Sequence, residues 1–61
     1  MAWVAVDKDG SEWVFDVKPQ RIHCEWEIRQ VYNMYVELPQ GSIEKLIGRE
    51  LTWDDDPVEL E

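Results

Sequence analysis

The sequence predicts a small α+β fold, in which one two-turn helix packs on a curved antiparallel sheet of four to five short strands. Three observations lead to this prediction. A chain of 61 residues has room for a single small domain, residues 1–61, and none for a doubly wound sheet or a TIM barrel. Up to residue 38, several runs have the alternating pattern or the β-branched and aromatic content of strands. An apolar stripe at helical spacing follows, at Ile43, Leu46 and Ile47.

An SH3-like small barrel is the alternative architecture, because it has the same order of strands and short helix. This alternative is an analogy at the level of the fold and carries no function with it.

The clearest local feature is a β-hairpin near the start of the chain. Residues 7–10, Asp-Lys-Asp-Gly, lie between two runs rich in Val, Trp and Phe, and this spacing suits a three-residue turn that ends on a left-handed glycine. The register that follows pairs Trp3 with Phe15, Val4 with Val14 and Ala5 with Trp13. One face of the hairpin then carries large aromatic rings and is the predicted core side. The opposite face carries a less expected strip of three valines, Val4, Val6 and Val14.

Two further strands are predicted in the middle of the chain. Residues 22–28 alternate, with Cys24 and Trp26 on the same side, and Cys24 is expected to be a small core residue. Residues 32–38 alternate as well, with Tyr32, Met34, Val36 and Leu38 on one side. Tyr35 falls on the polar side of that strand, beside Glu37, and is the ring that we expect to be exposed.

The last third of the chain contains the predicted helix and two short extended pieces. Residues 39–41 end the preceding strand, Ser42 is the expected N-cap and Gly48 the expected stop. Residues 50–53 are predicted as a strand, residues 54–57 as an acidic turn and residues 58–60 as a final extended piece. Residues 60–61, Leu-Glu, are either native or the remnant of a C-terminal expression tag.

Composition excludes several classes of function. Fourteen acidic and six basic residues give a formal net charge of -8, which repels phosphates and anionic membranes, so we expect no direct nucleic-acid binding and no membrane association. No basic, apolar leader is visible and no run approaches the roughly 20 apolar residues that span a bilayer. Cys24 is a single cysteine and forms no internal disulfide. These features predict a cytoplasmic protein.

The residues that carry chemistry form no catalytic or metal-binding pattern. Asp7 and Asp9 resemble the middle of an EF-hand loop, but that frame places Ala5 at the first ligand position, so a plain hairpin turn is favoured. Zinc requires four ligands of the Cys and His type, and the chain has only His23 and Cys24. We therefore predict that the protein is not an enzyme and that it has no cofactor and no metal.

One stretch of sequence carries a resemblance. Residues 37–53 read ELPQGSIEKLIGRELTW and are followed by an acidic turn and PVEL, while residues 3–10 read WVAVDKDG. Together these segments resemble short uncharacterised proteins carried by phages and mobile elements of gut bacteria. The resemblance leaves residues 19–33 unmatched. It implies a small stand-alone protein of phage origin, and it brings no activity and no site residue with it.

Two hypotheses of function remain. The first is a non-enzymatic protein-interaction module that forms a homodimer or binds another protein, through the second hairpin face or an unpaired edge strand. Its candidate surface is Val4, Val6, Val14 and Tyr35, since seven large rings exceed what so small a domain buries. The second is an acidic DNA mimic, whose carboxylates imitate phosphates and occupy a nucleic-acid-binding host protein.

Overall fold

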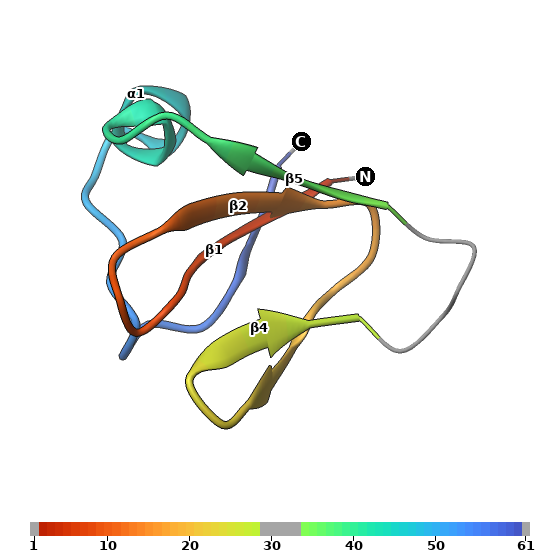
Figure 1. Ribbon diagram of the computed structural model, residues 1–61. Coiled ribbons are helices and arrows are strands. Elements are labelled where there is room, and N and C mark those ends of the chain that lie inside the picture. Colours follow the sequence, from red (N-terminus) through yellow and green to blue (C-terminus); the bar gives the residue numbers. More distant parts are fainter. Residues whose placement is uncertain (1, 29–33, 61) are drawn as a thin grey trace.

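The computed structural model describes residues 2–28 and 34–60 and has the predicted α+β architecture (Figure 1). The described elements are β1 (Trp3–Val6), β2 (Glu12–Phe15), β3 (Gln20–Ile22), β4 (Glu25–Glu27), β5 (Tyr35–Leu38), α1 (Ser42–Ile47) and β6 (Val58–Glu59). Four strands form an antiparallel sheet in the order β5-β2-β1-β6, and β3 and β4 form a separate hairpin. Among the described strands, β5 and β6 lie at the edges of this sheet.

The β1–β2 hairpin has the predicted turn and register. Val4 pairs with Val14 and Trp3 with Phe15. The Asp7 amide donates to the Ser11 carbonyl at 2.9 Å, and Gly10 has a φ of 92°, in the left-handed region that glycine adopts at no steric cost. These contacts confirm the predicted hairpin. It could be predicted because the turn residues by themselves specify the turn type and the register.

Both faces of the four-stranded sheet are covered. On the valine face, Val4 and Val6 pack with Ile43 of α1 and with Leu51. On the aromatic face, a second cluster consists of buried and half-buried residues from the sheet, the β3–β4 hairpin and the C-terminal turn: Ala5, Phe15, Trp26, Trp3, Trp13, Ile28 and Trp53. The prediction of a single, aromatic core side is thus incomplete, since the helix and the segment after it bury the valines as well.

The single strand predicted over residues 22–28 is wrong. The chain reverses at His23 and Cys24, where His23 has a φ of 56°, and Ile22 pairs with Glu25 across the turn. Cys24 is consequently exposed instead of lying in the core. Trp26 is buried, as its place in the pattern indicates, with its indole N–H donating to the Val6 carbonyl at 2.8 Å.

The N-cap of the helix is Gly41, one residue before the predicted N-cap, Ser42. Gly41 has a φ of 91°, while the Ser42 hydroxyl donates to the Pro39 carbonyl at 2.6 Å. Gly48 ends the helix as predicted, and its amide donates to the Glu44 carbonyl at 2.9 Å. Within the part of the chain that the structure describes, no helix is long and apolar enough to cross a membrane.

The C-terminal segment contains one strand where two extended pieces were expected. Residues 50–53 form no strand, whereas β6 pairs antiparallel with β1 at the edge of the sheet. The Leu60 amide donates to the Ala2 carbonyl at 2.7 Å, and the Leu60 side chain packs on the valine-face core. Of the strand predicted over residues 32–38, β5 is the described part, and Tyr32 lies outside the described residues.

Candidate functional site

The four residues predicted as an interaction surface do not form one. Val4 and Val6 are 0% and 6% exposed and belong to the core, and Val14 is half-buried against it. The expectation that this strip is open to solvent is wrong, because α1 and Leu51 cover it. Tyr35, in contrast, is 57% exposed on β5, as predicted. Of the predicted surface, Tyr35 is the one exposed residue, while Val14 is partly accessible.

Strand β5 carries a surface that the sequence analysis did not single out. Three consecutive apolar residues are exposed here, one just before the strand and two in it: Met34 is 71%, Tyr35 57% and Val36 56% exposed. β2 covers one side of β5, and no described strand covers the other. We call Met34, Tyr35 and Val36 the β5 edge. Edge strands with exposed apolar side chains are templates for pairing with another strand.

The backbone of the β5 edge presents hydrogen-bonding groups that no described residue pairs with. The Asp16 amide donates to the Met34 carbonyl at 3.2 Å, so Met34 directs its backbone groups toward β2. In an antiparallel ladder, residues that bond to the neighbouring strand alternate with residues that do not. The register pairs Val36 with Val14 and Tyr35 with Phe15. It follows that Tyr35 and Glu37 direct their N–H and C=O groups to the open side.

The Tyr35 side chain lies on the aromatic face of the sheet. Its ring centroid is 5.6 Å from that of Trp13 and 6.1 Å from that of Phe15. Val36 therefore points to the opposite face, because successive side chains alternate along a strand. The β5 edge thus offers an aromatic ring on one face and aliphatic side chains on the other.

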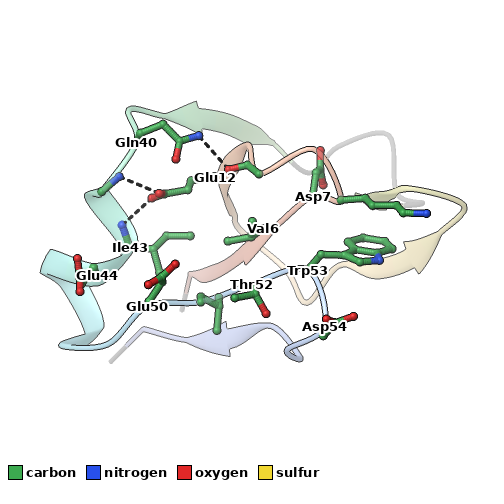
Figure 2. Close-up of a pocket in the computed structure, with 14 residues that line it drawn as sticks. Val6, Asp7, Glu12, Gln40, Ile43, Glu44, Glu50, Thr52, Trp53 and Asp54 are labelled. Atoms are coloured by element: carbon green, nitrogen blue, oxygen red, sulfur yellow. Dashed lines mark hydrogen bonds between the residues drawn. The ribbon is translucent and has the colours of Figure 1, made fainter.

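An acidic groove of about 620 Å³ is hollowed into the described surface (Figure 2). It lies between the β1–β2 hairpin, the start of α1 and residues 50–54. Val6, Ile43 and Leu51 supply apolar walls. Lys8 is the one basic residue among the described lining residues. Five carboxylates line the groove as well: Asp7, Glu12, Glu44, Glu50 and Asp54.

Glu12 uses its carboxylate to hold the helix. One carboxylate oxygen accepts the Gly41 amide at 2.8 Å and the other accepts the Ile43 amide at 2.9 Å (Figure 2). These amides belong to the first turn of α1, whose N–H groups have no partner within the helix. Glu12 is only 9% exposed. Its role is therefore structural, and no local pattern reveals it, because donor and acceptor lie 29 and 31 residues apart in the chain.

Asp7 likewise has a structural role. The residue is 6% exposed, and its carboxylate accepts the Trp26 amide at 2.9 Å, which joins the first hairpin to β4. Burial raises the pKa of Asp7 above its ordinary value of 3.8; the Trp26 amide opposes the shift, and the negative charges of Asp9 and Glu25 add to it. The remaining groove carboxylates, Glu44, Glu50 and Asp54, are exposed. No group of three potential metal ligands occurs among the described residues.

The shifted pKa predicts how Asp7 affects stability. Because the pKa of Asp7 is higher in the folded state than in the unfolded state, the folded protein binds more protons at pH values between the two. The contribution of Asp7 to stability therefore falls as pH rises above about 3.8. Asp7→Asn keeps an oxygen that accepts the Trp26 amide and removes the titration. We expect the free energy of unfolding of the variant minus that of wild type to increase as pH is raised from about 3 to about 7. Urea denaturation across this range measures the difference, and a difference that stays flat or worsens with pH contradicts the prediction.

Comparisons with known proteins give no relative: no family model, no curated protein and no solved structure matches the chain. The phage origin implied by the sequence resemblance stays a prediction.

Proposed function

We propose that the protein is a small non-enzymatic interaction domain that self-associates through the β5 edge. The observation that carries this proposal is the exposure of three consecutive apolar side chains, Met34, Tyr35 and Val36, on a strand with one open side. Pairing with a second copy removes these side chains from water and satisfies the free backbone groups of Tyr35 and Glu37. A dimer formed in this way extends the sheet across both protomers.

Charge selects the register of this pairing. A two-fold axis at Glu37 places two carboxylates directly opposite each other, which is unfavourable. An axis at Val36 pairs Tyr35 with the partner's Glu37 and Met34 with the partner's Leu38, and it unites the outward backbone groups of both strands in hydrogen-bonded pairs. The expected interface therefore has Val36 at its centre.

Substitution at that centre tests the proposal. Val36→Lys places two ammonium groups opposite each other across the axis and should weaken dimerisation at least about tenfold. Leu46→Lys on α1 is the matched control, because Leu46 has the same exposed fraction, 56%, as Val36. Sedimentation velocity over a concentration series measures both. The proposal fails if the wild-type chain stays monomeric up to about 1 mM, a limit beyond which association is very weak. Equal loss of association in Leu46→Lys also contradicts it.

The acidic rim of the groove favours a second candidate, the DNA mimic. Glu44, Glu50 and Asp54 are exposed around one hollow of a chain with net charge -8. Two of the basic residues are not among those that line the groove and lie over indole rings instead. Lys18 Nζ is 5.5 Å from the centroid of Trp3, and Arg21 lies over Trp26 and Trp53. A mimic should displace DNA from a basic nucleic-acid-binding protein, with an affinity that falls steeply as salt rises. Neutralising the three rim carboxylates to amides should abolish the displacement, while Val36→Lys should leave it unchanged.

A further inference from the structure

A second cavity, of about 290 Å³, lies between the aromatic face of the sheet and the β3–β4 hairpin. We call it the aromatic pocket. Trp13, Phe15 and Tyr35 line it from the sheet, and Trp26 lines it from the hairpin. Phe15 and Trp26 are 2% and 7% exposed, so the core holds these walls in place. The exposed ring of Tyr35 makes the pocket accessible from solvent.

The charged residues that line the aromatic pocket in the described part of the chain are all acidic. Asp7, Glu25 and Glu27 line it, and none of its described lining residues is basic. Asp9 and Glu25 are the charged groups that act on the Asp7 carboxylate, and both are negative. The pocket therefore combines a negative potential with aromatic faces and lacks an internal counter-ion among its described residues.

This combination favours a cation whose charge is spread over methyl groups. Aromatic faces attract such a cation through the ring quadrupole, and a weakly hydrated cation loses less hydration than a sodium ion when it enters an apolar site. One ring of the pocket already contacts a cation, since the Arg21 guanidinium carbon lies 4.7 Å from the Trp26 centroid; it also lies 4.8 Å from the centroid of Trp53, which is outside the pocket.

We propose that the aromatic pocket binds a quaternary ammonium group. Its volume is near the lower end of ligand pockets and suits a small head group. The Trp13 indole N–H lies near the Asp7 carboxylate without reaching hydrogen-bond geometry, and it is buried with no acceptor among the described residues. This N–H has an acceptor in the hydroxyl oxygen of choline, whereas a trimethyllysine head group has no oxygen and contacts only the rings and the carboxylates. Two sources carry the same chemistry, a small molecule such as choline and a trimethylated lysine side chain.

A paired titration tests the charge requirement. Choline and its neutral analogue 3,3-dimethylbutan-1-ol have the same shape, and only choline is charged. Both are added to the ¹⁵N-labelled full chain at constant ionic strength, and the indole N–H resonances of Trp13 and Trp26 are followed. We expect saturable shifts with choline and an affinity at least about tenfold lower for the alcohol. Equal shifts from the two compounds, or none from choline and a trimethyllysine peptide alike, overturn the proposal.

Variants separate the aromatic pocket from general attraction to an acidic protein. Tyr35→Leu removes an aromatic face and should weaken choline binding about threefold to tenfold. Glu25→Gln should weaken it about threefold, whereas Glu50→Gln, the same change of charge in the acidic groove, should leave it unchanged. Equal losses in the two Gln variants overturn the proposal. Tighter binding of either choline or the peptide identifies the source of the ligand and supports the site.

This inference does not require self-association, although Tyr35 belongs both to the β5 edge and to the aromatic pocket. Val36 lies on the face opposite Tyr35, so Val36→Lys should break the dimer and keep choline binding. Loss of choline binding in Val36→Lys would contradict the placement of the pocket.

Discussion

Val4→Lys is expected to unfold the domain at 25 °C. Val4 is 0% exposed and packs in the cluster that joins β1 to Ile43 of α1 and to Leu51. An ammonium group placed there loses its hydration without gaining a partner, at a cost of several kcal/mol. A domain of this size has a total stability of about 5 kcal/mol, so the substitution removes most or all of it. Circular dichroism and the dispersion of amide resonances report the loss of the fold.

The control for this substitution is Val36→Lys in the same sheet. Val36 pairs with Val14, on the strand next to β1, but it is 56% exposed, so its ammonium group stays in water and the fold should persist. If Val4→Lys instead retains the melting temperature of wild type, the valine face is not a core and the interaction surface first predicted there regains its basis.

Glu12→Ala is expected to lower the free energy of unfolding by about 2–4 kcal/mol. Glu12 accepts the amides of Gly41 and Ile43 at 2.8 and 2.9 Å, and hydrogen bonds to a charged group are the stronger class. Truncation leaves both amides without this acceptor at the beginning of α1 and opens space beside Ile43, which is 1% exposed. A helix of six residues has no stability of its own and depends on this docking.

Urea denaturation of two further variants isolates the capping role of Glu12. Glu12→Gln keeps one oxygen acceptor and should lose about half as much stability as Glu12→Ala. Glu44→Ala, on an exposed residue of the same helix, should change stability by less than about 0.5 kcal/mol. An effect of Glu12→Ala as small as that of Glu44→Ala would show that other contacts hold the helix.

Features of the fold that adjacent residues specify were predictable from the sequence, whereas features that depend on distant segments were not. The β1–β2 hairpin, its register and the end of α1 at Gly48 were predictable because a few adjacent residues specify each of them. Tyr35 is exposed as predicted, but alternation was not the reason, because its ring lies on the aromatic face and Val36 on the opposite face is equally exposed. The reversal at His23 and Cys24 was not predictable, since the alternation of residues 22–28 describes either one strand or two short strands around a turn.

The sequence by itself thus determined the α+β class, the first hairpin, the end of the helix at Gly48 and the net acidic charge. Only the tertiary structure decided which faces are covered. The docking of α1 buried the valine strip, the sheet order left the β5 edge open, and Glu12 reached the helix across 29 residues of chain. Turns and periodicity depend on neighbours in the chain, whereas burial and edges depend on which distant segments meet, and no local pattern records those contacts.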